Sequence, residues 1–272
     1  MIFMRYEPLK RSLGRIFSGS LFMRKFFYFI LDLLLLRTWH VNKALRKIRK
    51  ELPDQANILD AGSGFGQYEW RMCRMNKHWK IKAVDIDKEH IDDCTLFFKK
   101  AGMSERVSFS VADLTTFSDP ESYDLILSVD VMEHIREDEA VFRNFRKSLK
   151  INGILLISTP SDKGGSGVHG DEDKSFIGEH VRNGYGIQEI TGKLAAAGFN
   201  SIDALYTYGI PGNISWHLLM KYPVKMLNAS YLLLILLPFY YAVVFPVSMI
   251  LNIFDLRLTH KKGTGLLVTA RK

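Results

Sequence analysis

The stretch Asn57-Ile-Leu-Asp-Ala-Gly-Ser-Gly-Phe-Gly-Gln-Tyr-Glu-Trp70 predicts how the rest of the chain folds. Its apolar start predicts a buried strand, and three glycines at alternate positions predict a tight turn. The mixed polar and apolar residues after Gln67 predict a helix. A strand, a glycine turn and a helix in this order allow a backbone to approach a nucleotide closely, with helix N–H groups directed at it.

The spacing of the glycines indicates the kind of nucleotide. A dinucleotide site requires G-x-G-x-x-G, but the third glycine counted from Gly62 would fall on Gln67. Asp60 precedes the turn, and its charge would repel a pyrophosphate. A nucleoside with an ammonium group and no phosphate fits this carboxylate better. The alternative is a glycine-rich turn that binds nothing.

Length and cysteine content limit the class of protein. A chain of 272 residues can form one large domain, or one domain with appendages. Cys73 and Cys94 are far apart, which argues against a disulfide scaffold or a zinc site and suits a reducing compartment. No cleavable signal peptide is expected, because the first apolar run comes late and no small-residue cleavage site follows it.

The positive charge is concentrated at the N-terminus. Residues 1–52 contain 12 Lys and Arg but only 3 Asp and Glu, whereas the net charge of the whole chain is +8. The remainder of the chain is therefore close to neutral. A basic segment of this kind is typical of contact with nucleic acid or with an anionic membrane surface.

Two helices are predicted within residues 1–52. Residues 21–36 are apolar apart from Arg24, Lys25 and Asp32. Their uninterrupted apolar pieces are too short to cross a bilayer core of about 30 Å, so we expect this helix to lie in the membrane interface. Residues 39–52 form a basic amphipathic pattern, which suits either the membrane surface or packing on the domain with a solvated charged face. A continuous Phe and Leu block argues against nucleic acid.

Strand and helix patterns then alternate along the chain. Helices are predicted at 67–77, 87–100, 137–150 and 187–197, with Asp87 as an N-cap and Gly198 as a C-terminal stop. Such repeated units predict an α/β fold with a doubly wound, mostly parallel sheet that binds ligands at the carboxyl ends of its strands. After the first strand, further strands are predicted at 81–85, 107–111, 123–129, 154–158, 202–208 and 265–270.

An acidic residue followed by G-x-G-x-G resembles the first motif of the class I S-adenosylmethionine-dependent methyltransferases. Asp85 and Ala112-Asp113 match positions at the ends of the second and third strands. Ser128-Val-Asp-Val-Met-Glu-His-Ile135 resembles the small-molecule branch that includes the quinone-biosynthesis O-methyltransferases. Leu149-Lys-Ile-Asn-Gly-Ile-Leu-Leu-Ile157 matches the helix end and fifth strand. The resemblance covers about residues 45–210 with a final strand, and implies a Rossmann-like, seven-stranded fold.

The resemblance also implies a cofactor and the residues that hold it. The cofactor is S-adenosyl-L-methionine, and the product is S-adenosyl-L-homocysteine. Asp85 would take the ribose hydroxyls, and Asp113 with the backbone of Ala112 would receive the adenine amine. The implied cofactor-binding positions are Asp60, Ala61, Gly62, Gly64, Gly66, Asp85, Ile86, Ala112, Asp113 and Ser128.

Candidates for catalysis lie after the fourth and fifth strands. His134, with Glu133, is the candidate general base, since an imidazole titrates near neutral pH. A metal is not expected; the alternative is a divalent ion held by Asp130, Glu133 and His134. Residues 159–186 are glycine-rich and long for a connection, which predicts a lid over the site. His180 and Arg182 in this segment are candidates for substrate contact.

A second apolar region precedes the last strand. The 29 residues from Met226 to Phe254 carry no charge, but Pro238 and Pro246 interrupt them. A single crossing of the bilayer would place the last strand on the wrong side. We therefore expect a re-entrant hairpin or a pair of interfacial helices, and the alternative is an apolar cap or dimer contact. Basic residues flank the region, as anchors at anionic headgroups do: Lys221, Lys225, Arg257, Lys261 and Lys262.

The sequence thus predicts three parts. Residues 1–52 form a membrane-surface segment, 53–222 with 259–272 form the cofactor-binding domain, and 223–258 form the apolar insert. The predicted function is methyl transfer to a small, lipid-borne acceptor of quinone, isoprenoid or lipid-linked sugar type, on the cytoplasmic side of a membrane. The alternatives are a nucleic-acid methyltransferase that uses the basic N-terminus, and a non-catalytic membrane-bound binding module. The acceptor and the oligomeric state stay open.

Overall fold

The computed structural model describes residues 20–164, 181–230, 233 and 235–272. One seven-stranded sheet has the order β3-β2-β1-β4-β5-β7-β6, in which β7 alone runs antiparallel to its neighbours. The predicted fold class is therefore confirmed. The strands are β1 (Asn57–Ala61), β2 (Lys80–Asp85), β3 (Val107–Val111), β4 (Tyr123–Val129), β5 (Leu149–Pro160), β6 (Asn200–Thr207) and β7 (Gly265–Arg271).

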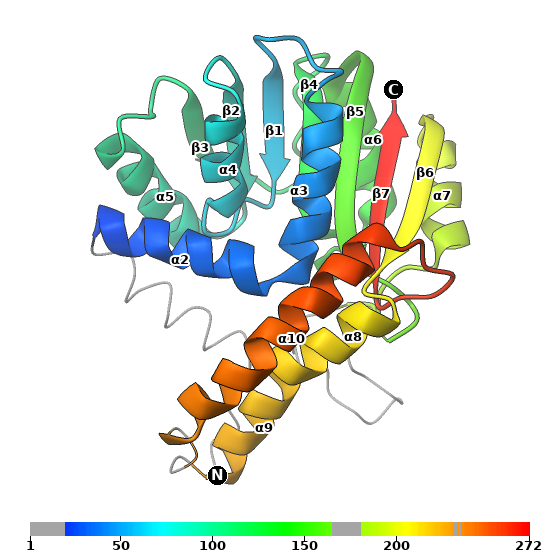
Figure 1. Cartoon of the computed structure of the whole chain (residues 1–272). Coiled ribbons are helices and arrows are strands. Elements are labelled where there is room, and N and C mark those ends of the chain that lie inside the picture. The colour runs from blue at the N-terminus through cyan, green and yellow to red at the C-terminus, as the bar shows by residue number, and fades with distance from the viewer. Residues whose placement is uncertain (1–19, 165–180, 231–232, 234) are drawn as a thin grey trace.

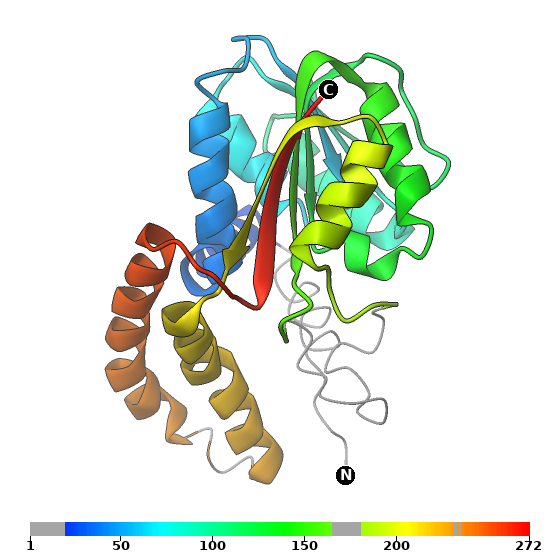
Figure 2. The ribbon, with the colours of Figure 1, turned by 90° about the vertical axis from the view of Figure 1, so that its right-hand side faces the viewer.

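Helices cover both faces of the sheet (Figure 2). One face carries α3 (Leu36–Ile48), α4 (Gln67–Met75) and α5 (Lys88–Lys100), and the other carries α6 (Asp138–Ser148) and α7 (Ile187–Ala196). Each face buries its own apolar cluster against the strands. This layering explains why the central strands read as continuous apolar runs in the sequence.

Two N-terminal helices pack on this domain. α2 (Leu21–Leu34) lies across the end of the sheet where β1 ends (Figure 1). It buries Phe27 and Tyr28, while Phe22 and Phe29 stay 73% and 58% exposed. α3 buries Val41, Leu45 and Ile48 in the core, so of the two expectations for this helix the structure shows packing on the domain.

A helical hairpin extends from the sheet between β6 and β7 (Figures 1 and 2). Its first arm runs without a break through α8 (Ile210–Trp216), the π-helical turn η2 (His217–Lys221) and α9 (Tyr222–Ala229). Its second arm is α10 (Leu237–Arg257), which packs on α8 and η2. The hairpin begins at Ile210, before the predicted boundary at 223. Since β6 pairs with β7, both arms start from the same end of the domain.

The polarity of α10 is inverted relative to that of a water-soluble helix. Its buried side chains are Ser248, Asn252 and Asp255, whereas Phe239 and Val243 are 73% and 69% exposed. Within the described residues, α10 is the one helix long and apolar enough to cross a membrane by length and composition. A polar seam inside and apolar side chains outside are expected of a helix whose outer surroundings are apolar.

The base of the hairpin is held by one buried carboxylate. Asp255 is fully buried, and its Oδ1 accepts a hydrogen bond from His40 Nε2 of α3 at 2.8 Å. Its Oδ2 accepts from the backbone N–H of Gly212 at 3.0 Å, and His260 Nε2 lies 3.2 Å from the same oxygen. Asp255 thereby joins both arms of the hairpin to the domain.

We expect Asp255→Asn to lower the free energy of unfolding by about 3 kcal/mol, since an amide cannot accept all of these hydrogen bonds and leaves a buried donor unpaired. Urea unfolding followed by circular dichroism measures the change. Asp203→Asn makes the same substitution at an exposed position of β6. It should change the free energy of unfolding by no more than about 0.5 kcal/mol. Equal effects for the two variants would contradict the role given to Asp255.

Candidate functional site

A cavity of about 760 Å³ lies at the carboxyl ends of the parallel strands. Its walls come from the segments that follow β1, β2, β3, β4 and β5, the usual location of ligands in such sheets. The volume lies within the range of about 300–1,000 Å³ that small-molecule sites occupy. The helical hairpin, the N-terminal helices and the adjoining ends of β6 and β7 contribute the rest of the lining.

The glycine turn after β1 packs tightly against Val131 at one position and is open at another. Gly62, Gly64 and Gly66 have φ angles of +95°, +50° and +78°, which side chains rarely adopt. A Cβ atom at Gly62 would lie 2.1 Å from Val131 Cγ2, whereas a Cβ atom at Gly64 would meet nothing within 4 Å. The turn therefore offers bare backbone to the cavity at Gly64.

Two side chains of α2 hold this turn from outside the cavity. The hydroxyl of Tyr28 and Nη2 of Arg24 both donate to the carbonyl oxygen of Phe65, at 2.6 and 2.8 Å. Arg24 is only 1% exposed and also pairs with Asp93 at 2.7 Å. This contact was not expected, because the composition of residues 21–36 predicted a membrane-surface helix.

Carboxylates gather at the end of the cavity that the glycine turn forms. Asp85 Oδ2 accepts from the backbone N–H of Gly64 at 2.8 Å, and Oδ1 accepts from that of Asp87 at 2.9 Å. Asp113 accepts from the hydroxyl and the backbone N–H of Thr115, which lowers the pKa of Asp113. The structure thus brings six of the predicted cofactor-binding positions to one cavity: Gly62, Gly64, Asp85, Ile86, Ala112 and Asp113.

The other four predicted positions do not line the cavity. Gly66 lies next to Tyr28, Cys94 and Phe98, on the side of the turn that α2 and α5 cover. The remaining three are buried in or directly after their strands: Asp60, Ala61 and Ser128.

Asp60 instead forms a buried acid pair with Glu69 of α4. Burial raises the pKa of Asp60 to about 7, an effect that the hydrogen bond with Glu69 opposes and the charge of Asp85 reinforces. Burial, followed by the charge of Asp60, raises the pKa of Glu69 well above its usual value. The pair therefore retains a proton near neutral pH. Of the carboxylates predicted to bind the cofactor, Asp85 and Asp113 line the cavity, and Asp60, contrary to the prediction, does not.

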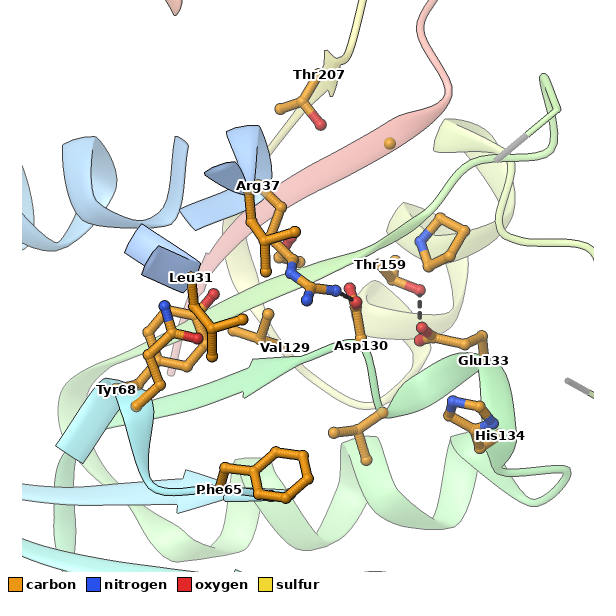
Figure 3. Close-up of a pocket in the computed structure, with 18 of the residues that line it drawn as sticks. Leu31, Arg37, Phe65, Tyr68, Val129, Asp130, Glu133, His134, Thr159 and Thr207 are labelled. Carbon is orange, nitrogen blue, oxygen red and sulfur yellow. Dashed lines mark hydrogen bonds and ion pairs between the residues drawn. The ribbon is translucent and has the colours of Figure 1, made fainter. Parts of the chain in front are cut away.

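The segment after β4 forms the middle of the cavity. Arg37 of α3 and Asp130 point toward each other and form an ion pair (Figure 3). Glu133 Oε2 accepts from the hydroxyl of Thr159 at 3.0 Å, and His134 lies beside it in the lining. The described residues contain no group of three His, Cys, Asp or Glu side chains placed to hold a metal, and Asp130 is engaged with Arg37.

Of the two candidates in the predicted lid, the structure describes one. Arg182 does not line the cavity: its Nη1 lies 2.5 Å from Asp138 Oδ2, and its Nη2 donates to the carbonyl of Ile135 at 2.7 Å. Arg182 thus ties the end of the lid segment to the segment after β4. His180 lies outside the described residues, as does most of the predicted lid.

The hairpin forms the far end of the same cavity, which the sequence analysis did not foresee. All of these lining residues lie in the continuous first arm: Asn213, Trp216, His217, Met220, Lys221 and Val224. The uncharged run in the sequence begins after them, so the boundary at 223 assigned all of them except Val224 to the cofactor-binding domain. The cavity therefore joins the glycine turn to the hairpin.

Comparisons with known proteins agree with this geometry. The family model of a methyltransferase domain matches residues 52–186. Ubiquinone biosynthesis O-methyltransferase of Pelagibacter ubique is 30% identical over 115 residues, which are 42% of this chain and 46% of that protein. The chain spans less than half the length of the curated relatives it matches.

Solved structures share the fold. A putative sarcosine dimethylglycine methyltransferase from Galdieria sulphuraria aligns with a TM-score of 0.60 at 18% identity, over 87% of this chain and 84% of that one. Phosphoethanolamine N-methyltransferase 2 of Haemonchus contortus, solved with S-adenosyl-L-methionine, aligns with a TM-score of 0.57 at 19% identity, over 85% and 52%. At these identities the likeness shows the fold alone.

The acid pair predicts a pH dependence of stability. The pKa of Asp60, about 7 in the folded chain, exceeds the usual value near 3.9. The folded state therefore holds a proton that the unfolded chain releases, and the free energy of unfolding falls as pH rises from about 4 to 7. Glu69 adds to this slope, because burial raises its own pKa well above the usual value. We expect Glu69→Gln, which removes this acid at constant volume, to flatten the slope by up to about 1.4 kcal/mol per pH unit, while Asp60 keeps its own contribution.

Urea unfolding at pH 4.5, 6 and 8 measures the slope. Glu139→Gln removes the same group from the exposed face of α6, and should leave the slope as in the wild type. An unchanged slope in Glu69→Gln would mean that Glu69 contributes nothing to it and that the burial of Asp60 alone produces the pH dependence.

Proposed function

Since the chain belongs to the class I S-adenosylmethionine-dependent methyltransferases, we propose that it methylates a small, lipid-borne acceptor at a membrane surface. The observation that carries this proposal is the single cavity that runs from the glycine turn to an apolar hairpin. The cofactor, when bound, supplies an electrophilic methyl group on a sulfonium.

The residues at the glycine turn fit this cofactor. The open backbone at Gly64 leaves room for the amino-acid part, and Asp85 suits the ribose hydroxyls. Asp113, whose pKa is lowered, offers an acceptor for the adenine amine. Two carboxylates also favour a cationic nucleoside over a phosphorylated one. The chain's task is then to hold two reactants in line and to exclude water.

His134 is the proposed general base for the acceptor. It lines the cavity in the segment after β4, next to Glu133 (Figure 3), and a histidine ring nitrogen is a common general base. Glu133, held by the hydroxyl of Thr159, orients the turn that carries His134. An acceptor that is already ionised needs no base.

The outer surface of the hairpin supports a membrane setting. Apolar side chains face outward along α10, and both arms start from one end of the domain, as a monotopic hairpin requires. Exposed basic residues stand at its base and along its first arm, where anionic headgroups would attract them: Lys225, Arg257, Lys261 and Lys262. We place the protein on the cytoplasmic side, with a quinone, isoprenoid or lipid-linked sugar as acceptor class.

Transfer of a labelled methyl group tests the activity. Purified protein is mixed with methyl-labelled S-adenosylmethionine, a membrane lipid extract and total RNA and DNA, and the phases are separated. We expect label in the organic phase. Label in nucleic acid would support a nucleic-acid methyltransferase, and absence of cofactor binding would support a binding module.

Asp85→Ala tests the cofactor site. The variant loses the acceptor of the Gly64 N–H and the proposed ribose contacts, so we expect at least tenfold weaker binding of S-adenosylhomocysteine in calorimetry. Asp92→Ala removes an exposed carboxylate of α5 that pairs with Lys88, and should bind as the wild type does. Unchanged affinity in Asp85→Ala would remove Asp85 from the site.

Sedimentation with vesicles containing anionic lipid tests the membrane surface. Replacing Phe239, Val243 and Ile250 of α10 by Ser removes three exposed apolar side chains, each worth about 1.5–3 kcal/mol on full burial. We expect the bound fraction to fall at least tenfold. Replacing Ile151 and Leu96, which are exposed elsewhere on the domain, should leave binding intact. Equal binding by both variants would exclude α10 as the anchor.

A further inference from the structure

We propose that His217 and Lys221 form a binding site for an anionic oxygen group of the acceptor, such as a phosphate or carboxylate that carries an apolar tail. This inference rests on the proposed function, because it names the acceptor class for the same cavity. Both residues line the cavity at the hairpin end, opposite the carboxylates of the glycine turn.

The two residues lie on a widened turn of the helix. η2 spans His217–Lys221, and the N–H of Tyr222 donates to the carbonyl of His217 five residues back. Pro223 follows directly; it has no N–H to donate and its ring crowds the preceding turn. A proline of this kind explains the π-helical turn, and such turns occur frequently at functional sites.

The widened turn is supported from the second arm of the hairpin. The π-helical pattern and Pro223 deprive the carbonyls of Leu218 and Leu219 of their usual helical donors. The hydroxyl of Tyr240 donates to the first and that of Tyr241 to the second, each at 2.8 Å. Two side chains of α10 thus stabilise an irregular turn at the position where it borders the cavity.

The contacts of His217 determine which of its nitrogens carries the proton. Nδ1 lies 2.8 Å from the carbonyl oxygen of Asn213, which only accepts, so Nδ1 donates. Nε2 is then an acceptor in the neutral ring, and Lys221 Nζ donates to it at 3.3 Å. His217 therefore positions the Lys221 ammonium.

Among the described residues, no carboxylate lies within ion-pair distance of the Lys221 ammonium. The ammonium lies 5.9 Å from the centre of the Trp216 ring, and neither this ring nor His217 is an acid. In the part of the chain that the structure describes, Lys221 forms no ion pair, unlike Arg37 and Lys163 in the same lining. A charge of this kind at a cavity wall attracts an anion.

The two ends of the cavity therefore differ in charge. Asp85, Asp87 and Asp113 stand at the glycine turn, and Lys221 stands at the hairpin. Met220 and Val224, which flank Lys221, add apolar lining beside it. A cationic nucleoside suits the first end, and an anionic head on an apolar tail suits the second.

Calorimetry with dodecyl phosphate below its micelle concentration tests the proposal, on the full chain with bound S-adenosylhomocysteine. We expect dodecyl phosphate to bind at least tenfold more tightly than dodecyl maltoside, and Lys221→Met to abolish this preference. Lys225→Met removes an exposed lysine one turn along that does not line the cavity, and should retain it.

His217→Phe should reduce the preference for dodecyl phosphate over dodecyl maltoside without weakening binding of the dodecyl chain. The phenyl ring keeps an aromatic side chain at this position, and only the polar contacts of the imidazole are lost. Inorganic phosphate in the same assay separates the possible sources: competition at millimolar concentration indicates a free phosphate site, and its absence indicates a lipid headgroup. Either result supports an anion site.

Equal binding of dodecyl phosphate and dodecyl maltoside by the wild type, while S-adenosylhomocysteine binds, would overturn the anion site alone. Failure of S-adenosylhomocysteine to bind would instead count against the proposed function. If Lys225→Met and Lys221→Met both lose the preference for dodecyl phosphate, the overall positive charge of the hairpin attracts the phosphate and no specific site does. This result would also overturn the proposal.

Discussion

The carbonyl oxygen of Phe65 accepts two hydrogen bonds from α2, and the position of the glycine turn depends on them. The donors, Arg24 and Tyr28, are buried, and a buried guanidinium is tolerated only where its hydrogen bonds and its ion pair are made. The same helix exposes Phe22 and Phe29 on its other side. Any surface that binds those two phenylalanines would therefore contact α2, the helix that holds the glycine turn in place.

The hairpin follows from a topological constraint. β6 and β7 are neighbours in one sheet, so the segment between them must return to its starting point. An antiparallel pair of helices meets this requirement, and it leaves the polar seam of Ser248, Asn252 and Asp255 inside. Asp255 then fixes the base of the pair to α3 through His40.

The sequence predicted what depends on local pattern. Most strands and helices of the α/β domain lie where alternation, caps and glycines indicated, and Asp87 caps α5 as expected. The prediction for the fifth strand was wrong at its start: β5 begins at Leu149, directly after α6, and not at Ile154. The burial of Asp60 was not foreseeable in this way, because it depends on Glu69 approaching from α4 in the folded chain. The contacts of α2 with Phe65 join residues about forty positions apart. No local sequence pattern indicates a contact between residues so far apart in the chain. The composition of α2 alone suggested only contact with a membrane surface.

The walls of the cavity explain how one site could orient two different reactants. The carboxylates at the glycine turn and the apolar and basic residues of the hairpin stand at opposite ends of one space. Asp85 and Asp113 would bind the cationic nucleoside at its non-reacting end, and the hairpin would bind the acceptor at its non-reacting end. Their reacting ends would then meet only in the middle of the cavity, beside His134. Leu31 of α2 and Leu35, which lies between α2 and α3, add apolar side chains to the lining. If both reactants are held at their non-reacting ends, as proposed, binding energy from the two ends of the cavity can be used for alignment at the centre.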